Sequence, residues 1–243
     1  MKALVVGGSS GIGLSIALNL VAQQEWDVVY VIDKNPIPKE FFSNKMQYVQ
    51  MDLVESVNHQ VLNKMDDISA LYITAGFGHL KYFQELDYRY IENSFAVNTL
   101  APIEIIRHYY ERLLGKSPFY CGVMVSIAGR LSSPMFSVYS ATKAALSKFI
   151  EAINVELEVQ GSNNRILEVS PGALKGTSFS GEKTEPSLTE DIAAEIIARS
   201  ERFEKLYIPQ YEEVFRGVIQ RYQKDPHKYG IESYWFKQKR INN

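Results

Sequence analysis

Short apolar runs alternate with segments of helical periodicity along most of the chain. The runs are rich in Val, Ile and Leu and do not alternate with polar residues, which is typical of strands buried on both faces of a parallel sheet. We therefore predict strands at residues 3–6, 28–32, 46–51, 70–74, 121–126 and 166–169, with a further candidate at 205–208.

Between these runs, apolar residues recur at the three- and four-residue spacing of amphipathic helices. This spacing predicts helices around residues 12–21, 91–113, 146–157, 189–202 and 211–222. Pro102 falls inside the second of them, so we expect a kink there. Repeated strand–helix units predict an α/β fold with a Rossmann-like, doubly wound parallel sheet in three layers, α/β/α.

We predict one domain over residues 1–243. Residues 172–187 show little periodicity, and we interpret them as a long substrate loop. Residues 211–243 are expected to form a C-terminal helix that ends at Asp225-Pro226, followed by an aromatic, basic tail.

Composition narrows the functional class. The formal net charge of -2 argues against a nucleic-acid binder and gives no reason to expect a membrane partner. The single cysteine, Cys121, allows no intrachain disulfide. The N-terminal residues lack the pattern of a signal peptide, and no apolar run approaches the roughly 20 residues that span a bilayer. We expect a soluble, cytoplasmic protein.

A glycine-rich turn joins the first predicted strand to the first predicted helix. Glycines allow a tight turn and a close approach of the backbone to a pyrophosphate, and the helix N-terminus offers unpaired N–H groups to the anion. The turn can also be a plain connection, but its position after a strand and before a helix favours a dinucleotide site. Its residues are Gly7, Ser9, Ser10, Gly11, Ile12 and Gly13.

Asp33 ends the second predicted strand, 20 residues beyond Gly13. A carboxylate there can accept both hydroxyls of an adenosine ribose and would repel a 2′-phosphate, which favours NAD over NADP. Lys34 beside it is a cation that can bind a 2′-phosphate, so NADP is not excluded. The alternative role for Asp33 is to cap a turn.

Tyr139 and Lys143 lie one helical turn apart, and Ser126 lies upstream at the carboxyl end of the fifth predicted strand. A free tyrosine has a pKa of about 10, and a nearby ammonium favours the phenolate. We therefore expect Lys143 to lower the pKa of Tyr139, so that Tyr139 acts as a general acid/base while Ser126 holds the substrate oxygen. The alternative is a surface Tyr–Lys pair beside a strand-end serine.

This combination resembles the short-chain dehydrogenase/reductase family, in its single-domain short form. The glycine turn matches the family's pattern, with Val6 in place of a threonine. Tyr139, Lys143 and Ser126 match its active-site motif and spacing. Asn98 resembles the Asn that completes a catalytic tetrad through a proton-relay water, and Asp52, followed by Leu53, resembles the Asp that contacts adenine.

The resemblance also implies coenzyme contacts after the fourth and sixth predicted strands. They would involve Ala75, Gly76, Pro171, Gly172, Leu174 and Thr177, together with Tyr139 and Lys143. Two departures stand out. Ile73-Thr74 replaces the family's Asn-Asn, and Thr177 comes one residue later than the usual pyrophosphate-facing threonine.

What the resemblance implies is an NAD(P)-dependent oxidoreductase that interconverts a secondary alcohol and a ketone or aldehyde. It also implies a homodimer or homotetramer that pairs through helices at about residues 87–114 and 137–160. The alternatives are a catalytically idle NAD(H)-binding sensor or scaffold and, from a branch with a longer substrate domain, a sugar-nucleotide epimerase or dehydratase. The four histidines, His59, His79, His108 and His227, lie far apart in the sequence, so no metal site is expected.

The predicted substrate pocket lies beside the carboxyl ends of the strands. Its walls would come from residues 77–83, 131–136 and 173–186. These segments suggest a partly apolar pocket, because they offer Phe77, Leu80, Leu131, Met135, Phe136 and Phe179.

Overall fold

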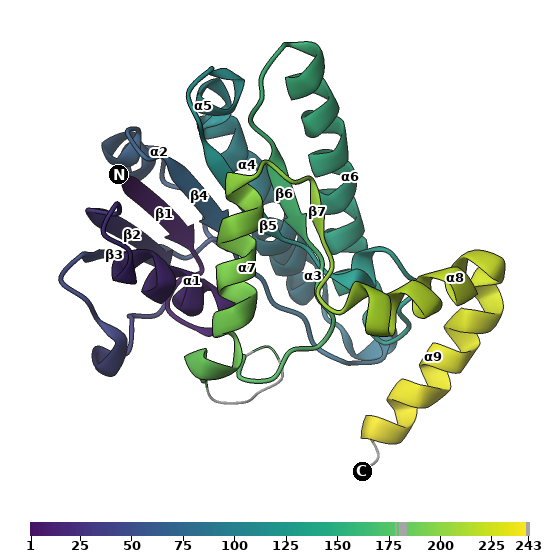
Figure 1. Cartoon of the computed structure of the whole chain (residues 1–243). Helices are drawn as coiled ribbons and strands as arrows, with labels where there is room; N and C mark the ends of the chain where they lie inside the picture. Colours follow the sequence, from purple (N-terminus) through teal and green to yellow (C-terminus); the bar gives the residue numbers. More distant parts are fainter. Residues whose placement is uncertain (178, 180–183, 242–243) are drawn as a thin grey trace.

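The computed structural model describes residues 1–177, 179 and 184–241, with side chains described through residue 239. Its centre is one sheet of seven parallel strands in the order β3-β2-β1-β4-β5-β6-β7 (Figure 1). The strands are β1 (Lys2–Val6), β2 (Val28–Asp33), β3 (Met46–Gln50), β4 (Ala70–Ile73), β5 (Tyr120–Met124), β6 (Ile166–Val169) and β7 (Leu206–Tyr207). Each predicted strand is present, and the candidate at 205–208 is the short edge strand β7.

Helices cover both faces of the sheet, which confirms the predicted three-layer, doubly wound fold. They are α1 (Gly11–Ala22), α2 (His59–Leu62), α3 (Tyr88–Phe95), α4 (Ala101–His108), α5 (Tyr110–Leu114), α6 (Ser137–Val159), α7 (Glu190–Glu201), α8 (Arg216–Lys224) and α9 (Pro226–Ile241). In the part of the chain that the structure describes, no helix is long and apolar enough to cross a bilayer.

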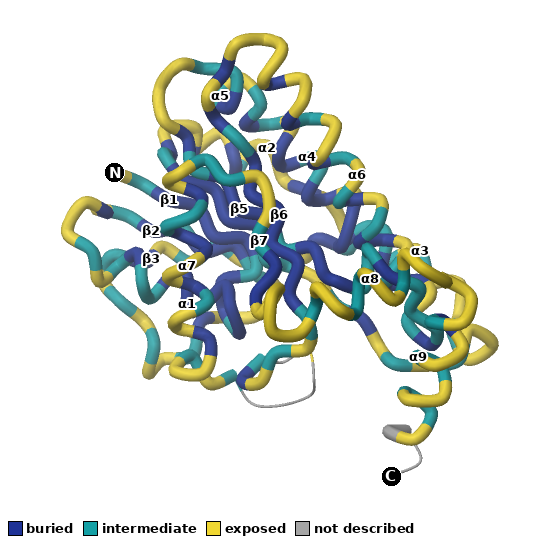
Figure 2. The backbone as a smooth tube through the Cα atoms, turned by 45° about the vertical axis from the view of Figure 1, so that its right-hand side comes forward, coloured by how far each residue is buried: buried dark blue, intermediate teal, exposed yellow. Residues whose placement is uncertain are grey.

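The inner strands β1, β4, β5 and β6 are buried on both faces, and successive side chains enter different cores. In β1, Leu4 and Val6 pack with residues of α4 and α6, whereas Ala3 and Val5 pack with residues of α1 and α7. Burying one such aliphatic side chain stabilises the fold by about 1.5–3 kcal/mol. Figure 2 shows the result: buried strands at the centre and exposed residues on the outer sides of the helices.

The long helical region predicted around Pro102 is divided at two points. After α3, one π-helical turn, Ala96–Leu100, leads into α4, and Pro102 lies in the first turn of α4, where its missing N–H costs little. A second break at Tyr109 separates α4 from α5. The predicted kink is therefore an insertion of extra backbone just before the proline, a feature often found at functional sites.

The segment predicted as an aromatic tail is instead the helix α9. Pro226 ends α8 as expected, but its fixed φ also suits the first position of a new helix. Asp225 caps that helix, because its Oδ1 accepts a hydrogen bond from the Lys228 N–H at 2.9 Å. α8 and α9 lie at the opposite end of the sheet from β3 (Figure 1).

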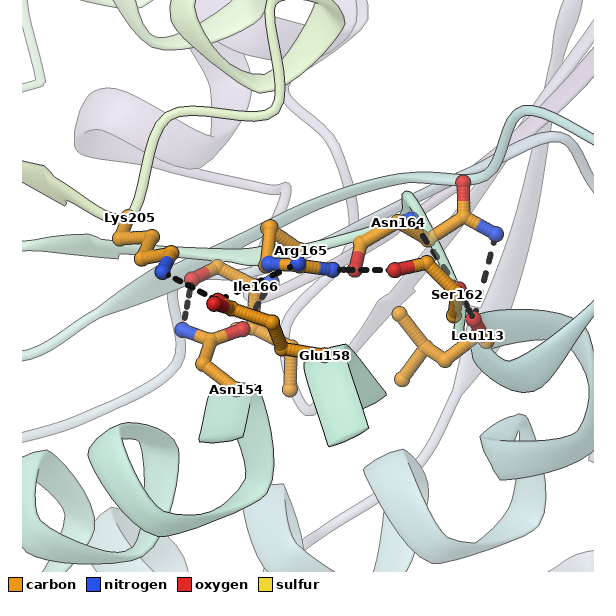
Figure 3. Close-up of polar contacts among 8 residues, drawn as sticks. All are labelled: Leu113, Asn154, Glu158, Ser162, Asn164, Arg165, Ile166 and Lys205. Carbon is orange, nitrogen blue, oxygen red and sulfur yellow. Dashed lines mark hydrogen bonds and ion pairs between the residues drawn. The ribbon is translucent and has the colours of Figure 1, made fainter. Parts of the chain in front are cut away.

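A group of polar contacts fixes the end of α6 to the start of β6 (Figure 3). The Asn154 side chain pairs with both backbone groups of Ile166, at 2.9 and 2.8 Å. Ser162 Oγ donates to the Leu113 carbonyl at 2.6 Å, and Lys205 forms an ion pair with Glu158 at 2.7 Å. These bonds set the position of α6, whose other end carries Tyr139 and Lys143.

Candidate active site

The site begins where the strand order reverses, between β1 and β4, which is where ligands bind in open α/β sheets. Here the glycine turn meets the chain that leaves β4. Gly7 has φ 84°, and a Cβ on it would lie 2.5 Å from the Ala75 nitrogen. A Cβ on Gly13 would lie 2.2 Å from the Gly7 oxygen. Only glycine fits at either position, so the turn leaves the N-terminus of α1 open beside β4.

Thr74 stands where the family has an asparagine, and its hydroxyl makes contacts of its own. Its Oγ1 lies within hydrogen-bond distance of the Val6 and Gly7 carbonyl oxygens, at 3.0 and 3.1 Å. The hydroxyl thereby joins the end of β4 to the glycine turn. The sequence shows that a threonine replaces the family's asparagine, but it does not show which carbonyl groups the threonine hydroxyl contacts.

Two other predicted coenzyme residues lie at this turn. The Asp33 carboxylate accepts hydrogen bonds from the Ser9 N–H at 3.1 Å and from the Asn35 N–H at 3.0 Å. On the other side, Thr177 lies beside Gly11, since a Cβ there would come 3.6 Å from the threonine Cβ.

The remaining coenzyme candidates are less closely grouped. Asp52 is exposed and accepts a hydrogen bond from the Val54 N–H at 2.9 Å, while Leu53 is buried in the core. Leu174 packs against the core on the α1 side of the sheet. The Pro171 carbonyl accepts a hydrogen bond from the Ile127 N–H at 3.0 Å, so it lies beside the Ser126 segment.

The predicted catalytic residues converge at the carboxyl end of β5. Ser126 lies just after that strand, and Tyr139 and Lys143 lie in the first two turns of α6. All three side chains are buried. Lys143 Nζ donates a hydrogen bond to the Met124 carbonyl at 2.8 Å and lies 5.9 Å from the centroid of the Tyr139 ring.

Asn98 completes this group from the π-helical turn. Its Oδ1 accepts a hydrogen bond from the Phe77 N–H at 2.9 Å, and its Nδ2 donates to the Phe77 carbonyl at 2.8 Å. Gly76 lies between two of the predicted catalytic residues, because a Cβ on it would come 3.1 Å from Lys143 Nζ and 3.2 Å from Asn98 Oδ1. The extra backbone of the π-helical turn thus brings an asparagine from the α3–α4 region to the lysine on α6.

Burial dominates the protonation of the two central groups. It raises the pKa of Tyr139 to about 12, although a hydrogen bond with Ser126 lowers that pKa in part. Burial also lowers the pKa of Lys143 to about 7. Both shifts favour the neutral form. In the protein alone, desolvation therefore sets the direction of the Tyr139 pKa, and the lowering expected from Lys143 does not contribute.

Aromatic side chains border Tyr139 on the side predicted to face the substrate. Its ring centroid lies 5.6 Å from that of Phe136 and 5.1 Å from that of Phe179. Phe179 is the described part of the predicted substrate loop between residues 177 and 184; residues 178 and 180–183 lie outside the described residues. Of the predicted apolar lining, Phe136 and Phe179 lie against the Tyr139 ring.

Two side chains from the C-terminal helical region reach this side, and sequence analysis missed both. Lys237 of α9 donates hydrogen bonds to Ser133 Oγ at 2.6 Å and to the Pro134 carbonyl at 3.0 Å. Phe215, just before α8, lies on Gly172, where a Cβ would come 2.4 Å from its Cζ. The helical periodicity of residues 211–222 marks Phe215 as an apolar, packing position. No sequence pattern marks Lys237 as a residue that contacts the 131–136 segment.

Comparisons with known proteins place this chain among oxidoreductases. The chain is 26% identical over 188 residues to an uncharacterized oxidoreductase of Saccharomyces cerevisiae, a match that covers 74% of this chain and 57% of that protein. It is 27% identical over 230 residues to retinol dehydrogenase 8 of Bos taurus, covering 89% and 72%, respectively. It is 30% identical over 190 residues to estradiol 17-beta-dehydrogenase 2 of Mus musculus, covering 73% and 49%. The chain thus spans about half to three quarters of the length of these relatives.

Solved structures share the fold at lower identity. A short chain dehydrogenase from Burkholderia cenocepacia in complex with NADP superposes with a TM-score of 0.74 at 20% identity, with 96% of each chain covered. One from Sphingobium yanoikuyae in complex with NADPH gives a TM-score of 0.73 at 20% identity, covering 92% of this chain and 95% of that one.

The family profile described as short chain dehydrogenase matches residues 1–187, which is more than half of the 243-residue chain. Together with the fold and the oxidoreductases among its relatives, this match shows that the chain belongs to the short-chain dehydrogenase/reductase family of oxidoreductases.

Proposed function

We propose that this protein is an NAD(P)-dependent oxidoreductase that interconverts a secondary alcohol and a ketone or aldehyde. The observation that carries the proposal is the convergence of Ser126, Tyr139, Lys143 and Asn98 beside the glycine turn. When bound, a nicotinamide coenzyme supplies the hydride donor or acceptor. An idle binding protein has no need to bury a lysine and a tyrosine together at that place.

In this proposal the chain's own residues hold the substrate oxygen and move one proton. Ser126 and Tyr139 bind the oxygen from one side. In the reductive direction the Tyr139 hydroxyl donates its proton to that oxygen, and in the oxidative direction the phenolate accepts it. Lys143 Nζ is close enough to Gly76 to bind a ribose hydroxyl there. Asn98 holds the backbone of Phe77 and is placed to orient a relay water.

The phenol cannot act as a base while its pKa stays near 12. A positive charge within about 4–6 Å lowers the pKa of an acid by 1–3 units. Protonated Lys143 and a cationic ring in the crevice would both act in this direction. We therefore expect base catalysis only in the coenzyme complex.

Hydride transfer across a panel of aliphatic and aromatic ketones, aldehydes and alcohols tests the reaction. Wild type should turn over at least one member, and Tyr139→Phe should lose at least about 100-fold in rate, as general acid–base catalysis contributes 10²–10⁴-fold. Coenzyme binding, measured by thermal shift, should persist in the variant. Equal rates in both proteins would remove Tyr139 from the mechanism, and binding without any turnover would favour an NAD(H) sensor.

We further propose that NAD(H) is the preferred coenzyme. The Asp33 carboxylate is fixed at the glycine turn by two backbone N–H groups, so a 2′-phosphate would meet a localised negative charge. Wild type should gain more thermal stability from NAD than from an equal concentration of NADP, and Asp33→Ala should narrow or reverse that difference. Stronger stabilisation of wild type by NADP would contradict the role of Asp33.

The substrate side favours a compound with an apolar body. Phe136 and Phe179 contact the Tyr139 ring, and two relatives bear the names retinol dehydrogenase and estradiol dehydrogenase. The panel should therefore include large apolar alcohols and ketones. Faster turnover of small polar carbonyls would contradict this expectation.

A homodimer or homotetramer is the proposed assembly. Val155 and Val159 on α6 are 59% and 82% exposed, and Leu100 before α4 is 60% exposed. Apolar residues in these positions fit a contact between copies through α4 and α6. Sedimentation should show an oligomer in wild type and a smaller species in Val155→Glu.

A further inference from the structure

Two histidines far apart in the sequence face each other where α2 meets α4. Nδ1 of His59, the first residue of α2, lies 3.5 Å from Nδ1 of His108, the last residue of α4, although 49 positions separate them. The ring centroids lie 5.6 Å apart. No spacing pattern in the sequence pointed to this pair.

A carboxylate holds the outer nitrogen of each ring. His59 Nε2 lies 2.6 Å from Glu104 Oε1, and His108 Nε2 lies 2.9 Å from Asp66 Oδ1. A carboxylate oxygen only accepts hydrogen bonds, so each Nε2 carries the hydrogen and donates. In a neutral imidazole the other nitrogen then bears a lone pair.

The two lone pairs therefore point into the same 3.5 Å gap. Two acceptors at that distance repel each other unless a proton or a metal ion lies between them. A tetrahedral zinc ion with Zn–N bonds of 2.0–2.1 Å places two nitrogen ligands about 3.4 Å apart. The gap between the Nδ1 atoms thus fits a bridging ion.

We propose that His59 and His108 bind one divalent transition-metal ion of the Zn²⁺ type through their Nδ1 atoms. The hydrogen bonds from Nε2 to Glu104 and Asp66 are the outer contacts that orient metal-binding imidazoles and make them better ligands. Side-chain exposure of 49% at His59 and 12% at His108 leaves one side open, so water can complete the coordination. The two carboxylates also favour a cation electrostatically.

The site lies apart from the reaction centre. Asp66 lies shortly before β4 begins, at the amino end of the sheet, whereas the catalytic residues follow the carboxyl end of β5. Figures 1 and 2 show α2 and α4 away from α9, which lies beside the candidate active site. A bound ion would join α2 to α4 and stabilise the folded chain, because the unfolded chain lacks the site.

Titration calorimetry of metal-free protein with ZnCl₂ tests the proposal. Wild type should bind one ion per chain at this site, and His59→Ala or His108→Ala should each weaken binding at least 10-fold. Glu104→Gln and Asp66→Asn should weaken it about 10–100-fold, the usual loss for outer contacts. His227→Ala is the matched control and should bind as wild type does.

Two further measurements identify the ligands. Cu²⁺ bound to wild type should show hyperfine coupling to two imidazole nitrogens in its electron paramagnetic resonance spectrum. Protons should compete with Zn²⁺ for these nitrogens, because the ligands must be deprotonated to bind the metal. If the double variant His59→Ala/His108→Ala binds Zn²⁺ as wild type does, or if imidazole ¹⁵N spectra show a proton shared by the rings that Zn²⁺ does not displace, the proposal is wrong.

Discussion

The ring of Tyr139 lies directly on Gly78. A Cβ added to this glycine would come 2.6 Å from Cδ2 and 2.7 Å from Cγ of the tyrosine. Contacts that short do not occur between real side chains, so any larger residue at position 78 must displace the ring. Because Phe136 and Phe179 also contact it, the ring has little room to move. Gly78 thus fixes the position of the phenol by lying against the face of its ring.

Gly78→Ala is expected to lower kcat/KM about 10–100-fold, since displacement of a catalytic group by 1 Å can cost about 100-fold. Coenzyme binding should change much less. Gly217→Ala is the matched control, because nothing lies within 4 Å of its added Cβ and alanine favours the helix by up to about 1 kcal/mol. Steady-state kinetics with thermal denaturation of both variants checks this. Full activity in Gly78→Ala would show that the ring position is unimportant.

Much of the fold could be predicted because its physical causes are local. Strands buried on both faces are largely apolar, so the inner strands β1, β2, β4, β5 and β6 stood out as apolar runs. The steric needs of the glycine turn at Gly7 and Gly13 are likewise local. Tyr139 and Lys143 share a helical face by their spacing alone.

The features that sequence analysis missed depend on distant contacts. The π-helical turn that carries Asn98 is held by bonds to α6, including Thr99 Oγ1 to the Thr142 carbonyl at 3.0 Å. Pro226 can end one helix or begin another, and here it does both, after α8 and before α9. The hydrogen bond that caps α9 at Asp225 shows that a new helix begins there. The His59–His108 pair arises when α2 packs beside α4, which no local pattern encodes.

Thr74→Val should weaken coenzyme binding and destabilise the protein by about 1 kcal/mol. The valine has nearly the same shape but leaves the Val6 and Gly7 carbonyls without the hydroxyl. Thr74→Ser keeps the hydroxyl and is the control. Urea denaturation and coenzyme titration of both variants measure the two effects. If Thr74→Val and Thr74→Ser behave alike, the hydroxyl does not hold the glycine turn.

Glu168 is a buried carboxylate, and its replacement should destabilise the fold strongly. Its Oε1 accepts two hydrogen bonds from Arg130, at 3.1 and 2.6 Å, and one from Ser170 at 2.7 Å. Ser147 donates to Oε2 at 2.9 Å. Arg130 and Ser170 lie next to the Ser126 and Pro171 segments, so this cluster lies beside the candidate site.

Glu168→Gln should therefore cost about 2–4 kcal/mol, less than a fully buried pair because the Arg130 side chain is 32% exposed. A double-mutant cycle with Arg130→Met should give a coupling of about 1–3 kcal/mol. Glu151→Gln, which breaks an exposed pair with Lys148, should leave the free energy of unfolding almost unchanged, because solvent screens that pair. Equal losses for Glu168→Gln and Glu151→Gln in chemical denaturation would contradict the role of the cluster.

The buried amine of Lys143 should make stability depend on pH in a predictable direction. Burial lowers its pKa to about 7 in the folded protein, from an ordinary value of 10.5. Between these two values the unfolded chain binds a proton that the folded protein has lost, so stability rises with pH across this window. Below about pH 7 both states are protonated, and the cost of burying the ammonium is largest and constant. Lys143→Met abolishes this dependence.

In the absence of coenzyme, the free energy of unfolding of Lys143→Met should exceed that of wild type most near pH 7. This difference should shrink by about 3 kcal/mol by pH 10. The other titrating groups are the same in wild type and in Lys143→Met, so their contributions cancel when the two free energies of unfolding are subtracted. Lys148→Met replaces an exposed lysine, 75% accessible, and should show no such trend. Urea denaturation at several pH values between 6 and 10 measures the difference. A gap that stays constant with pH would mean that Lys143 keeps its proton in the folded protein, and the amine would then have to be treated as a fixed cation beside Tyr139.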